Sequence, residues 1–429
     1  MTFLRKMKES LRKMKILWLG GIILPRIANN ENLPVNNTNG WLIRISEAIG
    51  ASQGVELVYL FDSDKDLRGK TDFYSYYGIK CNGSTAKKVV DRYFQKAREI
   101  IEFERPDIVH IWGTERPHTY SMVKACEEAG IGNRVIISIQ GLVSVYAEHY
   151  EAYLPNKIVN RLTLRDFFKG NIAKGKSNYQ KAGKFEIEAL KKVHHVIGRT
   201  DWDRACAWNI NPDAEYHFNN ETLREEFYSG KWKLMECEPH SMFCSQGHYP
   251  IKGIHLAIKA LKRIIEEFPD AKLYIGGKDY FSLPRWQLSS YSKYICDLVN
   301  ELGLREHVVF TGFLSASQMK ERLLKTNVFI SPSSIENSPN SLGEAMLLGV
   351  PCVASDVGGV RNLMTDKEEG YIYPADEHYM ISFYVCNLFR QPQIAAAVSE
   401  KAHRRAMLTH DYNNNLECLN NIYKTIIDK

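Results

Sequence analysis

The chain of 429 residues is longer than one hydrophobic core usually supports, so two domains are expected. Hydrophobic residues make up 44% and charged residues 25%, which is typical of folded globular proteins and excludes a disordered chain. The net charge of +6 is small for this length and is not gathered on one segment of the body of the chain, which argues against a nucleic-acid partner.

No stretch approaches the roughly 20 apolar residues of a membrane-spanning helix. The start of the chain also lacks the apolar core of a signal peptide, so we expect a cytoplasmic protein. The nine cysteines are scattered, and no two of them have the spacing of a zinc or redox motif. We therefore expect reduced thiols.

Residues 1–13 form a basic leader. Lysines and arginines dominate residues 5–15, and apolar residues recur there at spacings of three or four, so a helix would be basic on one side and apolar on the other. Such a helix can lie against an anionic membrane through residues 1–15. A frayed segment before the first strand is the alternative, and both interpretations stay open.

Strand and helix signals alternate along the N-terminal half, which predicts an α/β fold with a parallel sheet. The expected strands cover 15–19, 55–61, 107–112 and 135–139, and the expected helices cover 41–49 and 89–103. Residues 144–185 are rich in Tyr, Asn and Lys and show no sheet pattern. We interpret them as a helical insertion or lid, or as solvated surface helices.

A second alternating series begins after residues 210–240. Its expected strands cover 242–244, 272–275, 308–310, 328–330 and 352–354, and its clearest helix covers 254–268. Two doubly wound halves are thus expected, and in such folds ligands bind at the carboxyl ends of the strands and in the cleft between domains.

The most informative segment is residues 331–346, where a buried strand is followed by a turn and a helix. Ser341 is expected to cap that helix, with Glu336 in the loop before it and Glu344 in its first turn. The backbone amides of Ser341 and Leu342 would be unpaired donors at the positive end of the helix, which is a phosphate site. Carboxylates on both sides suit a ligand whose hydroxyl groups flank a diphosphate.

These residues, with the Gly-Val-Pro turn at 349–351 and the Asp-x-Gly-Gly sequel at 356–359, resemble the signature of the retaining family 4 glycosyltransferases of GT-B fold. The sequence of these motifs is similar to that of bacterial enzymes that build capsules and other surface polysaccharides. The resemblance is dense over 240–375 and thinner over 14–145. It implies that Glu344 holds the ribose of a nucleotide-sugar donor and that Glu336 faces the donor sugar.

Lys252 and Gly253 follow a strand and open a helix, as in the Lys-Gly step of that family. The resemblance implies that this lysine neutralises the leaving diphosphate, while glycine permits a close backbone approach. The family usually has an arginine a few residues earlier, where this chain has Gln246, Gly247 and His248. Arg285 and Arg361 are candidate substitutes.

Other candidate donor contacts lie in the loop before the helix and in the N-terminal half. Gln140 stands where many relatives have a histidine that contacts the donor sugar, and we expect a contact from its amide. Two glycines that follow the first strand resemble a flexible loop beside the diphosphate. His110 alternates with apolar residues and is expected to be a core histidine. The remaining candidates are Gly20, Gly21, Asn337, Ser338 and Asn340.

The predicted fold is therefore α/β of the GT-B type, two Rossmann-like doubly wound domains facing across a cleft. Residues 14–215, including the segment 144–185, would bind the acceptor, and residues 216–405 would bind the donor. Residues 406–429 would form a helix that packs back on the first domain. The segment 144–185 could meet a sugar acceptor.

The predicted function is transfer of a hexose-type sugar from a nucleotide-diphosphate sugar to a hydroxyl of a glycan or lipid-linked glycan, with retention of configuration. The resemblance implies that the enzyme needs no metal and no other cofactor. Two alternatives stay open. One is a nucleotide-sugar epimerase of the same fold, and the other is a non-catalytic binding subunit of a polysaccharide-assembly complex.

Overall fold

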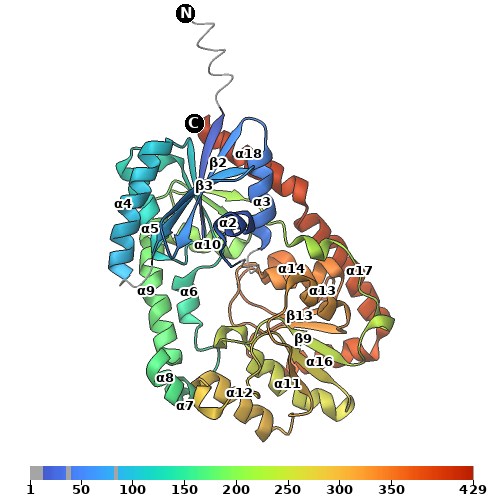
Figure 1. The fold of residues 1–429 in the computed structure, drawn as a ribbon. Helices are drawn as coiled ribbons and strands as arrows, with labels where there is room; N and C mark the ends of the chain where they lie inside the picture. The colour runs from blue at the N-terminus through green and yellow to red at the C-terminus, as the bar shows by residue number, and fades with distance from the viewer. Residues whose placement is uncertain (1–12, 35–39, 82–85, 429) are drawn as a thin grey trace, which may run out of the picture.

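The computed structural model describes residues 13–34, 40–81 and 86–428, which form two parallel-stranded lobes stacked one above the other (Figure 1). The basic leader over 1–12 lies outside the described residues. Met14, which the amphipathic pattern included in a helix, instead begins the first strand, and Lys15 pairs with Glu104 at 2.9 Å. No helix in the described ranges is long and apolar enough to cross a membrane.

The upper lobe is built on an eight-stranded sheet in the order β3-β4-β2-β1-β5-β6-β7-β8. Its strands are β1 (Met14–Gly20), β2 (Val55–Ser63), β3 (Leu67–Lys70), β4 (Tyr74–Lys80), β5 (Ile108–Trp112), β6 (Val135–Ser138), β7 (His195–Gly198) and β8 (Glu215–Phe218). The neighbours are parallel, as expected, except β3 and β4 at the edge, which are antiparallel. The central strands are continuous apolar runs because helices cover both of their faces.

This lobe carries the helices named next, most of which cover the two faces of its sheet. They are α2 (Pro25–Glu31), α3 (Gly40–Ala51), α4 (Ala86–Glu104), α5 (Pro117–Glu128), α6 (Val143–Glu148), α7 (Asn156–Val159), α8 (Leu164–Lys169), α9 (Ile172–Leu190) and α10 (Asp201–Ile210). The segment 144–185 is helical and reaches down to the other lobe, where α7 and α8 lie beside α12 (Ser290–Glu301) (Figure 1). Arg161 bonds Asp297 there at 3.1 Å.

The lower lobe has a six-stranded parallel sheet in the order β11-β10-β9-β12-β13-β14. Its strands are β9 (Ser241–Cys244), β10 (Lys272–Ile275), β11 (Val308–Phe310), β12 (Val328–Ser331), β13 (Cys352–Ser355) and β14 (Tyr371–Tyr373). Its other helices are α11 (Ile254–Glu267), α13 (Ala316–Leu324), α14 (Asn340–Leu348), α15 (Val360–Leu363), α16 (His378–Arg390) and α17 (Pro392–Thr409). The strand order reverses between β9 and β12, so the loops after these two strands diverge and leave room for a ligand.

The last helix, α18 (Tyr412–Ile427), lies along the upper lobe rather than the lower one (Figure 1). Its buried residues Leu419, Tyr423 and Ile426 belong to the same apolar cluster as Trp18 of β1. The Tyr423 hydroxyl accepts a hydrogen bond from Trp18 Nε1 at 3.0 Å and lies 2.6 Å from His110 Nδ1. His110 is fully buried and also meets the Ser138 hydroxyl at 2.7 Å, which confirms a core histidine.

We predict that Tyr423→Phe lowers the free energy of unfolding by about 1–3 kcal/mol, because it leaves buried groups of Trp18 and His110 without their shared partner. Thermal unfolding should show a midpoint a few degrees lower. Tyr379→Phe is the matched control, since Tyr379 is exposed and the same atom is removed. Equal midpoints for the two variants would contradict the prediction.

Candidate functional site

The loops after β9 and β12 bring a lysine and a glutamate together at the carboxyl edge of the lower sheet. Lys252 ends a short 3-10 turn, η4 (Pro250–Lys252), and its Nζ lies 2.5 Å from Glu336 Oε1. The Ser333 hydroxyl donates to the same oxygen at 2.7 Å. Burial lowers the pKa of Lys252, but the attraction and hydrogen bond of Glu336 outweigh burial and leave that pKa above its ordinary value. The lysine is therefore a permanent cation at neutral pH.

Gly253 makes this approach possible without lining the site. Its φ is +65°, and a Cβ at this position would lie 1.8 Å from the carbonyl oxygen of Pro332. Only glycine fits, because the left-handed conformation and the close contact both exclude a side chain. Gly253 thus sets the distance between the two loops that carry Lys252 and Glu336.

Glu344 forms a second buried ion pair, with a partner that sequence reasoning missed. Arg224 comes from the segment between β8 and β9, and its Nε and Nη2 each lie 2.6 Å from one carboxylate oxygen of Glu344. Burial raises the pKa of Glu344, and the guanidinium acts in the opposite direction. The pairing is the planar, bidentate one that arginine and carboxylate geometry favours.

The start of α14 differs in detail from the prediction. The residue at its N-cap is Pro339, with no side-chain cap, so Ser341 is not the cap and Glu344 lies beyond the first turn. The Leu342 amide donates to the Pro339 carbonyl at 3.0 Å, so the prediction that this amide is unpaired was wrong. The Gly343 amide also donates to the Pro339 carbonyl, at 3.2 Å, so the backbone of the N-cap residue takes both of these amides.

A cavity of about 480 Å³ contains both ion pairs and is lined by residues of both lobes. Of the residues predicted from sequence it holds Gln140, Lys252, Glu336, Ser338, Asn340, Ser341 and Glu344. Arg199, Arg224, Gln246 and His248 add to its polar wall, while Phe313, Leu314, Ala316 and Met319 form an apolar part. Burial and the neighbouring Lys252 lower the pKa of His248, so this ring is neutral near pH 7.

Five predicted residues lie outside the lining of this cavity, namely Gly20, Gly21, Gly253, Asn337 and Leu342. Gly20 packs against the Tyr59 hydroxyl, which would lie 2.0 Å from a Cβ, and Gly21 faces Arg116. The Leu342 side chain is fully buried. These positions shape the fold around the site and are not placed to touch a ligand in this cavity.

Asn337 joins the two lobes. Its Oδ1 accepts a hydrogen bond from the Thr200 hydroxyl at 2.9 Å, and its backbone N–H donates to the Tyr146 hydroxyl at 3.1 Å. Thr200 and Tyr146 belong to the upper lobe, so the loop that carries Glu336 is fixed against that lobe. The domains are thereby held in register directly beside Lys252 and Glu336.

Arg199 places a further cation in this cavity. It follows β7, lines the cavity together with Lys252, and forms an ion pair with Glu221. Gln140 lies between them, because its Nε2 donates to Glu221 at 2.5 Å and its Oε1 accepts from Arg199 at 3.4 Å. The candidate substitutes do not reach the site: Arg361 is exposed and pairs with Asp356, and Arg285 lies outside the cavity lining.

Glu115, which follows β5, is a further carboxyl beside the site that sequence reasoning missed. Its Oε2 lies against Gly113, next to the Gln140 side chain. Burial, with a smaller contribution from the nearby Glu186, raises the pKa of Glu115 to about 7. The only hint in the sequence was its position directly after a buried strand.

We predict that Glu115→Gln flattens the pH dependence of stability between about pH 4.5 and pH 7. In this window the folded carboxyl holds a proton that the unfolded chain has lost, so the wild type should lose stability as the pH rises, by on the order of 1–2 kcal/mol. Urea unfolding at pH 5 and pH 8 measures the difference. Equal pH dependence in wild type and variant would contradict the assignment.

Comparison with known proteins indicates which family the region around this cavity resembles. Residues 236–405 match the family model described as glycosyl transferases group 1. The C-terminal lobe is thus similar to the glycosyl transferases group 1 family. The matched region includes Lys252, Glu336 and Glu344, and the loops that carry them.

Solved structures extend the similarity to the whole fold. Sucrose-phosphate synthase from Thermosynechococcus elongatus superposes with a TM-score of 0.73 at 14% identity, covering 97% of this chain and 100% of that one. Anabaena HepE in complex with UDP-glucose superposes with a TM-score of 0.65 at 15% identity, covering 96% of this chain and 100% of that one. The two Rossmann-like lobes therefore adopt the predicted GT-B fold.

Among curated relatives, a GDP-mannose-dependent alpha-(1-6)-phosphatidylinositol monomannoside mannosyltransferase of Mycolicibacterium smegmatis is 28% identical over 213 residues, which is 48% of this chain and 49% of that protein. The matched region is also less than half of the length of the first two relatives. The chain thus spans less than half of the length of these curated relatives.

Proposed function

We propose that the protein transfers a hexose-type sugar from a nucleoside diphosphate sugar to a hydroxyl of a glycan or lipid-linked glycan, with retention of configuration. The observation that carries this proposal is the cavity between the lobes in which Lys252, Glu336, Glu344 and the start of α14 meet. This cavity offers cations for the diphosphate of a donor, carboxylates for its hydroxyl groups and apolar side chains for its base.

The donor is proposed to lie along the cavity from its apolar part to the Lys252–Glu336 pair. Phe313 and Leu314 would contact the base, and Glu344 would accept hydrogen bonds from the ribose hydroxyls. The diphosphate would meet the amide-rich start of α14 near Ser341 and the ammonium group of Lys252. Glu336 would face the sugar. HepE, whose structure contains UDP-glucose, shares this fold.

Transfer would break the bond between the anomeric carbon and the diphosphate oxygen and form a bond from that carbon to the acceptor oxygen on the same face. The acceptor hydroxyl would give its proton to the departing phosphate. Lys252 would offset the negative charge that develops on the leaving group, which is where a fixed cation in a desolvated site lowers the barrier most. Arg199, in the same cavity, would add to that field. No metal is required by this scheme.

The acceptor is proposed to approach from the upper lobe. Tyr146 of the segment 144–185 contacts the loop of Glu336, since its hydroxyl accepts from the Asn337 N–H, and we place Tyr179 and Glu115 on the same side of the site. Aromatic faces pack against sugar rings while carboxyls and hydroxyls bond the sugar hydroxyls. This proposal gives the helical segment a role in binding as well as in joining the lobes.

The test begins with a thermal-shift screen of UDP-, GDP-, ADP-, dTDP- and CMP-sugars, in which only bound ligands raise the melting temperature. The best donor is then incubated with glycan and lipid-linked acceptors, with and without EDTA, and the anomeric configuration of the product is read by NMR. We expect one donor class to stabilise the protein and an EDTA-resistant product that retains the donor configuration. Rapid conversion of the donor to an epimer or free sugar without acceptor would overturn the proposal.

A further inference from the structure

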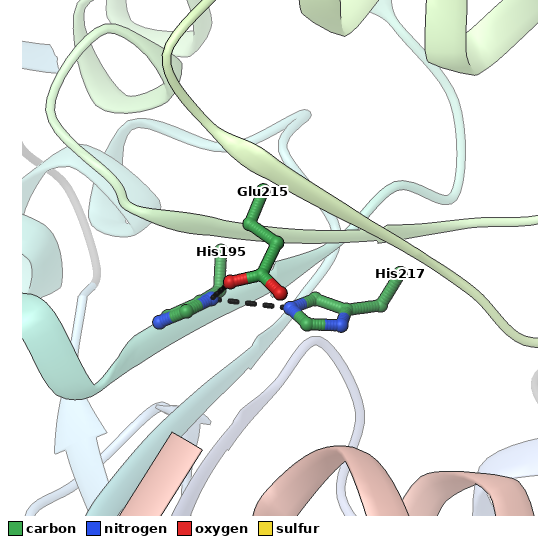
Figure 2. Close-up of side chains that lie close together, drawn as sticks. All are labelled: His195, Glu215 and His217. Carbon is green, nitrogen blue, oxygen red and sulfur yellow. Dashed lines mark hydrogen bonds and ion pairs between the residues drawn. The ribbon is translucent and has the colours of Figure 1, made fainter. Parts of the chain in front are cut away.

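Three potential metal ligands meet on β7 and β8, the last two strands at one edge of the upper sheet, away from the donor cavity. His195 begins β7, and the register places Glu215 of β8 opposite it and His217 opposite Ile197. Glu215 and His217 are two residues apart on one strand and so share the face on which His195 lies. Figure 2 shows the three side chains pointing toward one another.

The distances between their ligand atoms suit one small ion. His195 Nδ1 lies 3.1 Å from His217 Nε2 and 3.5 Å from Glu215 Oε2, and the three ligand atoms lie within 4.8 Å of one another. Zinc bonds to nitrogen and oxygen are about 2.0–2.2 Å long, so the ligands of a tetrahedral ion stand about 3.3–3.6 Å apart. Two of the three separations are thus already close to those of a tetrahedral site.

The chemistry of the set also selects the ion. Two imidazoles with one carboxylate suit zinc and its neighbours among the transition metals, whereas calcium and magnesium prefer oxygen ligands only. His195 is only 7% exposed, which fixes one ligand, while Glu215 is exposed and leaves a route for the ion and a water. Within the described residues this is the one His/Cys/Asp/Glu group with such geometry.

We propose that His195, Glu215 and His217 form a zinc site that clips the edge strand β8 to β7. An edge strand has a neighbour on one side only, and β8 leads directly into the segment that carries Leu223 and Arg224 of the donor cavity. The ion would hold β8 near its first residue, at the opposite end of β7 from Arg199. The site is structural and takes no part in the transfer reaction.

Equilibrium dialysis of the full chain against micromolar Zn²⁺, followed by metal analysis, tests the site. We expect one ion per chain in this site for the wild type. His217→Ala and Glu215→Gln should bind Zn²⁺ at least about 10- to 100-fold more weakly, since even the loss of an outer partner of a metal ligand has that effect. His240→Ala is the matched control, because His240 pairs with Asp270 on the lower lobe.

Glu215→Gln keeps the proposal testable if the histidine variants fold poorly, because Glu215 is exposed. Equal Zn²⁺ binding by wild type and Glu215→Gln, or no binding by the wild type, would overturn the site. Hydrogen exchange tests the clip: Zn²⁺ should slow exchange of the β8 amides in the wild type and not in His217→Ala. Bound Zn²⁺ with unchanged β8 exchange would overturn the structural role.

Discussion

Lys252→Ala is expected to lower kcat for sugar transfer by about 10²–10³-fold, the usual cost of removing one group that stabilises charge in the transition state. In the proposed reaction the negative charge on the leaving diphosphate grows as the bond breaks, so the ammonium group matters more in the transition state than in the bound donor. The rate constant should therefore fall more than the donor affinity. Steady-state kinetics with the donor identified by thermal shift measure the two separately.

The same substitution removes the ion-pair partner of a buried carboxylate. Glu336 is only 7% exposed and would keep the Ser333 hydroxyl as its remaining partner. Part of any loss could then come from a displaced loop, which circular dichroism and the melting temperature would reveal. Lys262→Ala is the matched control, since Lys262 is exposed on the neighbouring helix α11. A folded Lys252→Ala enzyme with kcat within threefold of wild type would remove Lys252 from the catalytic role.

The parts of this site that sequence revealed are those encoded locally. The strand predicted over 328–330 is Val328–Ser331 in the structure, because a buried apolar run followed by prolines specifies both the strand and its end. The strand over 242–244 is similarly confirmed as Ser241–Cys244. Since both strands run parallel, the loops that follow them lie at one edge of the sheet, so the sequence alone assigns Lys252 and Glu336 to one site.

The parts that sequence did not reveal depend on contacts between distant segments. Arg224 lies 120 residues before Glu344, in a stretch without regular strands or long helices, so no periodicity marked it as a partner. The zinc ligands depend on the register of β7 and β8, two strands of four residues each, separated by a helix. The expected Ser341 cap was wrong because the helix begins one residue earlier, at Asn340, with Pro339 at its N-cap.

The hairpin of β3 and β4 was missed for a different reason. β3 (Leu67–Lys70) alternates between half-buried and exposed residues and contains one apolar side chain, so its composition resembles a loop. Its strand conformation comes from pairing with β4 at the edge of the sheet. Propensity is a weak guide there, because an edge strand is stabilised mainly by its neighbour.

Glu344→Ala is expected to weaken donor binding by about a hundredfold, since hydrogen bonds from ribose hydroxyls to a carboxylate contribute about 1.5–3 kcal/mol each. It should also destabilise the protein, because Arg224 is left half-buried without its partner. Breaking such a pair by removing one side costs about 3–5 kcal/mol when fully buried, and about 2–3 kcal/mol is expected for this partly exposed arginine. Thermal shift with the donor and unfolding without it measure the two effects.

A double-mutant cycle separates the two roles of Glu344. Arg224→Ala should destabilise the protein as well, whereas the double variant should recover much of the stability, because neither charge then lacks a partner. Donor binding should not recover, since the carboxylate that meets the ribose is absent in both variants that lack Glu344. If donor binding returned together with stability, the pair would be a structural brace between α14 and the connecting segment. The ribose would then have to be held by other groups of the cavity.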